Sequence, residues 1–259
     1  MQPIFTTQIT KYKADENFAI DDILVREIKL EILLNDVKIG AMMATPTDLT
    51  ELAIGYLLSE NIITNPKDIL DALFDEKTLS VKIIAKANQK ALNNLNSEGI
   101  IISGCGRSVT ANIDLQSLDA KKIQSDMKFQ RREISKQMSE FYTQCDLYEK
   151  TGCVHTAKLF IGDKFYIGED IAQHNTIDKA IGKAVLGGAD LNSGFLMVSG
   201  RLSSEMVVKA VMNSIPLLVS RTAPTSLGVL IARKFNLTLC GFARGENLNV
   251  YSGAERIYA

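Results

Sequence analysis

The sequence predicts a mixed α/β protein in which a smaller, β-rich α+β part precedes a layered α/β part. Apolar residues in the first part fall at alternate positions, which is the period of a half-buried strand. After Gly152, strand-like and helix-like segments take turns up to the C-terminus, as they do in α/β sheets. A length of 259 residues has room for two modest domains. We therefore expect domains at residues 1–125 and 126–259.

The composition excludes several classes of protein. Hydrophobic residues make up 46% and charged residues 23% of the chain, which rules out disorder, collagen-like chains and coiled-coil rods. A net charge of −1 gives no overall field that would attract nucleic acid or an anionic membrane. No apolar run reaches the roughly 18 residues of a membrane span, and the N-terminus lacks a secretion signal. We expect a cytoplasmic protein without nucleic-acid or membrane partners.

The first part begins with a predicted hairpin and helix. Apolar residues stand at every second position from Ile28 to Leu34, residues 35–36 can turn, and residues 37–43 can return as the partner strand. Asp48 and Glu51 then have the spacing of a capping box, and apolar residues follow at helical intervals. This pattern predicts one helix packed on the strands.

The end of the first part contains a cysteine between two glycines. Residues 79–83 predict another strand, and the asparagine-rich segment 86–98 has no periodicity and predicts a surface loop. The apolar run 99–103 predicts a buried strand, after which Gly104 and Gly106 flank Cys105. We expect this thiol to be poorly shielded. The polar residues from about 115 to 132 are the candidate link between the domains.

The second part is predicted as a series of alternating elements. Residues 134–148 form an amphipathic pattern that predicts one helix with Cys145 on its core face. The expected strands lie near 156–161, 164–168, 195–199, 217–220, 238–242 and 249–251, and the expected helices near 175–186, 203–213 and 224–235.

The four cysteines show no common framework. They stand at Cys105, Cys145, Cys153 and Cys240, without a CxxC pair or a repeated spacing. A disulfide framework or a four-cysteine zinc site is therefore not indicated. Cys240 falls in an apolar strand and is expected in the core.

Polar residues gather where the predicted strands of the second part end. These clusters are residues 152–155, 169–175, 199–205, 221–225 and 242–247. Because open α/β sheets bind ligands beyond the carboxyl ends of their strands, we expect the clusters to converge on one pocket.

The same clusters contain groups that suit phosphates. Predicted helix starts at Asn175, Ser203 and Thr225 offer backbone N–H groups. The planar guanidinium groups of three arginines fit phosphate oxygens; these are Arg201, Arg221 and Arg244. A phosphorylated or nucleotide-bearing ligand fits this set. The alternative is that the hydroxyl residues are helix caps and the arginines are solvated.

The chain has only two histidines, His155 and His174. Each could carry a proton or bind a ligand, and each could equally be a structural residue. Asp170 lies four residues before His174 and would orient its ring if the intervening turn is helical.

Several long motifs occur in order from about Glu27 to the end of the chain. They read TPTDLTELAIGYLLSENII, SGCG, TGCVHTAKL, EDIAQHNTIDKAIGKAV, SGRLSSEMVVKAV and SRTAPTSLGVLIARKFNLTLCGFARGENLNVYS. Together they resemble the FdhD/NarQ family of formate dehydrogenase accessory sulfurtransferases. A set of long ordered motifs is far more specific than any single short motif.

The resemblance implies a sulfur carrier. Such a protein receives sulfur from a cysteine desulfurase as a cysteine persulfide. It passes the sulfur to the molybdenum or tungsten bis-molybdopterin guanine dinucleotide cofactor before insertion into formate dehydrogenase. The resemblance also implies a homodimer, a C-terminal domain with the three-layer α/β fold of cytidine deaminase, and Cys105 as the catalytic, sulfur-carrying residue.

The chemistry of sulfur transfer suits the Cys105 loop. A thiolate attacks a persulfide sulfur, so the carrier has to be exposed and able to meet two partners in turn. Arg107 would favour the thiolate if its side chain lies close. Many relatives have a second cysteine where this chain has Ser108, which implies a single-cysteine mechanism here. Cys153 replaces a glycine of many relatives and could assist, although a tolerated substitution is the simpler interpretation.

The family's pocket motifs, carried over residue by residue, give the candidate cofactor-binding residues. These are His155, Asp170, His174, Ser199, Gly200, Arg201, Thr222, Ala223, Phe242, Ala243, Arg244, Gly245, Glu246 and Asn247. The molybdenum cofactor is expected as a bound substrate, and no zinc or other metal ligands are assigned.

Three other functions are alternatives to sulfur transfer. A zinc deaminase needs a glutamate two residues after the zinc histidine and a PCxxC motif, whereas His155 is followed by Thr156 and Ala157 and the chain has no PCxxC. A non-catalytic chaperone that binds the molybdenum cofactor would share the whole predicted pocket. A generic nucleotide-binding enzyme lacks support because neither GxGxxG after a strand nor GxxxxGK[ST] is present.

Overall fold

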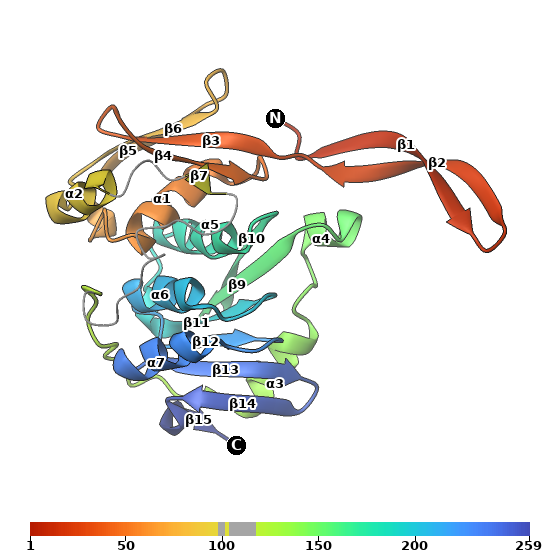
Figure 1. The fold of residues 1–259 in the computed structure, drawn as a ribbon. Helices are drawn as coiled ribbons and strands as arrows, with labels where there is room; N and C mark the ends of the chain where they lie inside the picture. The colour runs from red at the N-terminus through yellow and green to blue at the C-terminus, as the bar shows by residue number, and fades with distance from the viewer. Residues whose placement is uncertain (98–101, 104–117) are drawn as a thin grey trace.

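Two large β-sheets with helices between and around them make up the fold (Figure 1). The computed structural model describes residues 1–97, 102–103 and 118–259. The mixed α/β class predicted from the sequence is confirmed, with a β-rich N-terminal part and a layered C-terminal part.

The N-terminal sheet has five strands in the order β5-β6-β3-β4-β7. Their bounds are β3 (Ile28–Leu34), β4 (Val37–Ala44), β5 (Ile69–Asp75), β6 (Ser80–Ala85) and β7 (Ile102–Ser103). The predicted alternation holds in β3, where Leu30 and Ile32 are buried and Lys29 is exposed. A 3-10 helix, η1 (Pro66–Asp68), precedes β5, and α1 (Leu49–Ser59) packs on the sheet.

The C-terminal sheet has six strands in the order β10-β9-β11-β12-β13-β14. Their bounds are β9 (His155–Ile161), β10 (Lys164–Asp170), β11 (Gly194–Val198), β12 (Leu217–Ser220), β13 (Thr238–Arg244) and β14 (Asn247–Ser252). Strands β11, β12 and β13 are parallel to one another, while the pairs β10·β9, β9·β11 and β13·β14 are antiparallel.

Helices cover both faces of this sheet and give it three layers (Figure 1). One face carries α5 (Gln173–Leu186), α6 (Ser204–Met212) and α7 (Ser226–Lys234), and the other carries α3 (Arg131–Ser139). Strand β9 serves both faces, because Ala157 and Leu159 join the core under α5 to α7 and Phe160 joins the core under α3. Short elements at the periphery are α4 (Asp146–Thr151), η2 (Leu191–Ser193), η3 (Ala254–Arg256) and the parallel pair β8 (Phe129–Gln130) and β15 (Ile257–Tyr258).

Helices α1 and α5 join the two parts of the chain. A Cβ atom added at Gly55 would lie 1.9 Å from the carbonyl oxygen of Asp178, and one added at Gly182 would lie 2.0 Å from that of Glu51. The two glycines therefore allow the helix backbones to touch. The main hydrophobic core runs through this contact from the first sheet to the second, across the predicted domain boundary at residue 125.

Three local predictions were wrong. Residues 86–98 were expected to form a loop, but Gln89–Ser97 form helix α2, because Asn88 accepts a hydrogen bond from Lys90 N (3.2 Å) and Ala91 is buried. The helix expected at 134–148 ends at Ser139, since a turn with Gln144 in the left-handed region separates α3 from α4. Asp48 precedes α1 but makes no side-chain cap; it pairs instead with Lys183 at 2.7 Å.

A long N-terminal ribbon has no counterpart in the sequence prediction. Strands β1 (Ile4–Lys13) and β2 (Glu16–Val25) pair in antiparallel fashion along their whole length. The ribbon projects away from the two large sheets (Figure 1). Of the strand expected at 99–103, the structure describes only β7, and the Cys105 loop lies outside the described residues.

Candidate functional site at the edge of the C-terminal sheet

The polar clusters lie along one edge of the six-stranded sheet. Strands β10, β11, β12 and β13 run in the same direction, so their carboxyl ends meet at this edge. The antiparallel strands β9 and β14 begin there, at His155 and Asn247. The N-termini of α5, α6 and α7 follow directly after these strand ends. This edge therefore combines exposed polar side chains with the positive ends of three helices.

His155 and Ser199 meet where β9 begins and β11 ends. The His155 Nδ1 atom lies 3.1 Å from Ser199 Oγ, and Ser199 Oγ accepts a hydrogen bond from the backbone N–H of Thr156 (3.1 Å). The hydroxyl proton of Ser199 is then free to point to Nδ1, which favours the proton on Nε2. Partial burial, followed by the nearby His174 and Arg201, lowers the pKa of His155, so this ring is neutral at pH 7.

The loop after β11 is packed tightly. A Cβ atom at Gly200 would come within 2.4 Å of the Gln173 side chain, whose Nε2 donates to the Arg201 carbonyl (2.8 Å). Ser220 Oγ donates to the Gly200 carbonyl (2.6 Å). These bonds hold the loop in one shape and leave the Arg201 side chain exposed.

Two more arginines lie on the neighbouring loops. Arg244 Nε donates to the carbonyl of Arg221 (3.0 Å), which ties the end of β13 to the loop after β12. The Arg221 guanidinium lies 5.7 Å from the centre of the Tyr142 ring, a cation–π arrangement. Arg131 donates to the Glu246 carbonyl (3.0 Å) in the turn between β13 and β14. The loops at this edge are therefore rich in guanidinium groups suited to phosphate oxygens.

The residues around the β13–β14 turn have different orientations. Phe242 has a positive φ of 51° and is exposed, whereas Ala243 is buried in the core under α3. Gly245 has a φ of 56°, which suits glycine in this turn. The carbonyl of Thr222 accepts from Phe242 N (3.0 Å), and that of Ala223 accepts from Leu202 N (3.1 Å). The Thr222 hydroxyl also lies 3.1 Å from Ser220 Oγ.

His174 pairs with Glu205 and not with Asp170. His174 Nε2 lies 2.6 Å from Glu205 Oε2, between the first turns of α5 and α6. This contact, ahead of the opposing effect of burial, lowers the pKa of Glu205. The expectation that Asp170 orients the His174 ring was wrong, because the Asp170 carboxylate is fully engaged with other groups.

Asp170 is completely buried and holds the start of α5. Its Oδ2 accepts from Thr45 N (3.0 Å) and pairs with Lys179 Nζ (2.7 Å), and its Oδ1 accepts from Ala172 N (2.9 Å) and Asn175 Nδ2 (3.0 Å). Asn175 Nδ2 also donates to the Met43 carbonyl (2.9 Å) at the end of β4. Three of these four donors belong to α5 and the residue just before it, and the fourth, Thr45 N, ties Asp170 to the N-terminal part of the chain.

The helix starts differ in how their N–H groups are used. Thr225 caps α7 by accepting from Gly228 N (3.1 Å), which fits the capping alternative for this residue. Ser203 precedes α6 without a side-chain cap. Helix α5 begins at Gln173, two residues earlier than predicted, so Asn175 lies inside its first turn.

The three described cysteines occupy two kinds of environment. Cys145 and Cys240 are fully buried, as predicted, and burial raises their pKa to about 11 and about 12. Cys153 is exposed, two residues before His155. Cys105 lies outside the described residues.

Several residues of the site were not singled out from the sequence. Gln173, Lys179, Thr45 and Ser220 contact the predicted residues, but each is bonded to a segment distant in the sequence. A fully buried lysine within a helix has no local sequence signal. Glu205 was within a predicted cluster, but its pairing with His174 depends on how α5 and α6 pack.

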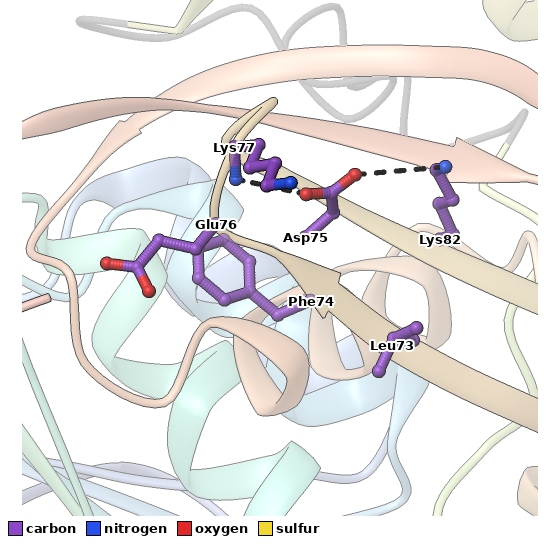
Figure 2. A pocket seen from close by; sticks show the side chains of 6 residues that line it. All are labelled: Leu73, Phe74, Asp75, Glu76, Lys77 and Lys82. Carbon is purple, nitrogen blue, oxygen red and sulfur yellow. Dashed lines mark hydrogen bonds and ion pairs between the residues drawn. The ribbon is translucent and has the colours of Figure 1, made fainter.

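A shallow hollow lies elsewhere, at the turn between β5 and β6 (Figure 2). Its volume is about 620 Å³, and its lining residues are Leu73, Phe74, Asp75, Glu76, Lys77 and Lys82. Asp75 accepts from Lys77 N (3.0 Å) and pairs with Lys82 at 4.0 Å. The hollow contains none of the predicted site residues, so the candidate site rests on the loop cluster.

The described part of the chain has neither a membrane-spanning helix nor a cluster of metal ligands. No helix there is both long and apolar enough to span a membrane. No group of three or more His, Cys, Asp or Glu side chains among residues 1–97, 102–103 and 118–259 is arranged to hold a metal ion.

The fold and this loop cluster define a three-layer α/β protein with a polar site at the carboxyl edge of its sheet. The model of the FdhD/NarQ family matches residues 25–258, and the chain belongs to that family. The Sulfur carrier protein FdhD of Wolinella succinogenes is 41% identical over 238 residues, covering 92% of this chain and 83% of that protein. The protein of the same name from Listeria innocua is 33% identical, covering 99% and 100%.

A solved structure shows the same fold. The crystal structure described as that of a formate dehydrogenase accessory protein from Desulfotalea psychrophila matches with a TM-score of 0.79 at 26% identity. The match covers 99% of this chain and 100% of that one.

Proposed function

We propose that this chain is a sulfur carrier and sulfurtransferase that serves formate dehydrogenase. Cys105 receives sulfur from a cysteine desulfurase as a persulfide and passes it to the molybdenum bis-molybdopterin guanine dinucleotide cofactor, bound as substrate at the sheet edge. Family membership over residues 25–258 and the names of the relatives from Wolinella and Listeria support this role. The proposed location of the protein is the cytoplasm.

The path of the chain before Cys105 is the structural observation that carries the proposal. Strand β7 pairs in parallel with β4, which sets Ser103 beside Met42. The next residue of β4, Met43, accepts a hydrogen bond from Asn175 in the first turn of α5. Strand β7, which ends two residues before Cys105 in the sequence, therefore lies close to the candidate site.

The first transfer step needs a thiolate on Cys105. This thiolate attacks the terminal sulfur of the desulfurase persulfide, a new S–S bond forms on Cys105, and the desulfurase cysteine leaves as a thiolate. The step balances without an external oxidant or reductant. Ser108 replaces the second loop cysteine of many relatives, so a single thiol carries the sulfur.

The loops of the sheet edge supply binding for the dinucleotide ends of the cofactor. Arg201, Arg221 and Arg244 provide charge-assisted donors for diphosphate oxygens. The start of α6, where Ser203 makes no side-chain cap, adds a positive dipole end. His155, Ser199 and the remaining predicted residues border the same edge.

The N-terminal ribbon supports the proposed homodimer. A two-stranded ribbon is marginally stable by itself, yet this one leaves Phe5, Phe18 and Leu24 between 41% and 48% exposed. Three cross-strand pairs follow one another along one face of the ribbon: Thr7–Asp22, Ile9–Ile20 and Lys11–Phe18. A second ribbon related by a two-fold axis at Ile9 would set Lys11 against Asp22 of the other copy.

Formate dehydrogenase activity in cells distinguishes a sulfur carrier from a cofactor chaperone. A strain without this protein is supplied with wild type, Cys105→Ala or Cys153→Ala, and formate-dependent dye reduction is measured in extracts with equal amounts of each protein. The proposal predicts that Cys105→Ala gives the activity of the empty strain and that Cys153→Ala gives wild-type activity. Full activity with Cys105→Ala would contradict the carrier role and favour a chaperone.

A further inference from the structure

Helices α1, α5 and α6 meet around a buried cluster of charged groups. Lys209 Nζ on α6 lies 3.0 Å from Oδ1 and 2.8 Å from Oδ2 of Asp178 on α5. Ser59 Oγ on α1 donates to Asp178 Oδ1 (2.7 Å). Asp178 and Lys209 are almost completely buried, with exposed fractions of 1% and 3%. Asp178 and Lys209 thus neutralise each other inside the protein.

Glu60, directly after α1, adds a second carboxyl group to this cluster. Its Oε1 lies 3.7 Å from Lys209 Nζ, beyond hydrogen-bond distance. Both carboxyl oxygens are buried and accept no hydrogen bond from the described residues. An ionised carboxylate without donors is costly in such a place, and the Lys209 ammonium group is already bound to Asp178.

Charged groups from each surrounding helix act on Glu60. Burial is the largest cause that raises its pKa to about 7; Asp178 on α5 and Glu205 on α6 raise it further, while Lys209 on α6 and His174 on α5 lower it. The Tyr56 hydroxyl on α1 lies in the same region, and burial followed by the charge of Glu60 raises its pKa, so it stays neutral.

The cluster is continuous with the candidate site. On α6, Glu205 lies one turn before Lys209, and on α5, His174 lies one turn before Asp178. His174 and Glu205 are in contact at 2.6 Å, with 38% and 18% of their side chains exposed. A line of charges therefore runs from the rim of the site to Glu60.

We propose that Glu60 holds a proton in the resting protein, so that the buried cluster behind the candidate site is electrically neutral. The carboxyl group has no hydrogen-bond donor among the described residues, and the Lys209 ammonium beside it is already bound to Asp178. Loss of this proton would leave an uncompensated negative charge where α1, α5 and α6 meet. This inference does not depend on sulfur transfer, because it concerns only the proton on Glu60.

Two variants test the proton on Glu60. Glu60→Gln keeps the size of the side chain but cannot ionise. The matched control is Glu133→Gln, which changes an exposed glutamate on α3.

Infrared spectroscopy of the wild type tests the proton on Glu60 without any variant. At about pH 6, exposed carboxyl groups are ionised, so a C=O stretching band of a protonated carboxyl that shifts in D₂O belongs to a buried group. The band should fade as the pH rises past 7, and it should be absent from Glu60→Gln and present in Glu133→Gln. Absence of the band from the wild type at about pH 6 would show that Glu60 is ionised and would overturn the proposal.

Discussion

The buried pair of Asp170 and Lys179 holds the candidate site to the N-terminal sheet, and replacing Asp170 with asparagine tests this role. Both side chains are fully buried, and Lys179 Nζ also donates to the carbonyls of Thr45 and Glu169 (3.1 and 3.0 Å). Asp170→Asn keeps the size of the side chain but removes the negative charge. One N–H of the new asparagine amide would also face a group that donates a hydrogen bond to Asp170 in the wild type.

The expected loss of stability is large. Removing one partner of a buried ion pair costs about 3–5 kcal/mol, because the other charge is left without compensation. Burial already lowers the pKa of Lys179, so Lys179 would lose its proton more easily in the variant, and we expect a value near 3 kcal/mol. Lys179→Met should cost less, since Asp170 would keep its donors from Thr45, Ala172 and Asn175.

Urea unfolding followed by circular dichroism measures both free energies. The matched control is Asp71→Asn, an exposed aspartate on β5, which should change the stability by less than about 0.5 kcal/mol. The m-value should stay the same in all variants. A loss below about 1 kcal/mol in Asp170→Asn would refute the idea that this pair clamps the site.

Three further predictions concern pH, helix packing and anion binding. Folding raises the pKa of Glu60 from 4.5 to about 7, so the wild type should lose at most about 3 kcal/mol of stability as the pH rises through this range. Glu60→Gln should not show this loss. Parallel pH profiles of the two proteins in thermal melts would argue against this. Gly182→Ala would put a Cβ atom 2.0 Å from the Glu51 carbonyl oxygen, so the free energy of unfolding in urea should fall by about 1–3 kcal/mol. An unchanged free energy would show that the two helices can separate freely. Arg244→Gln should weaken the binding of inorganic pyrophosphate about tenfold in calorimetry. The control Lys164→Gln, which changes an exposed lysine, should bind pyrophosphate as the wild type does. Equal affinities of Arg244→Gln and the wild type would show that Arg244 is not part of the site.

Local patterns in the sequence were sufficient for most of the strands and helices. In β3 the alternation of Leu30 and Ile32 with polar neighbours reflects a sheet with one face on the core. The convergence of strand ends was predictable because parallel strands in an α/β sheet place their carboxyl ends at one edge. The left-handed turn at Gln144 was not predictable, because a short amphipathic pattern does not show where a helix is interrupted.

The contacts inside the site depend on packing between distant segments. His174 has Asp170 four residues away in the sequence, yet it pairs with Glu205 from another helix, because Asp170 is bound to Thr45 of the N-terminal part. The unpartnered carboxyl group of Glu60 likewise arises where three helices meet. Such arrangements follow from tertiary structure and leave no local trace in the sequence.

The most direct test of the central claim is mass spectrometry of the intact protein and its peptides after incubation with a cysteine desulfurase and cysteine. Wild type is compared with Cys105→Ala and Cys153→Ala. The proposed mechanism predicts one additional sulfur atom on the peptide that contains Cys105, present in wild type and Cys153→Ala and absent from Cys105→Ala. Sulfur that remains in Cys105→Ala, or a wild type that gains none, would contradict the assignment of Cys105 as the sulfur carrier.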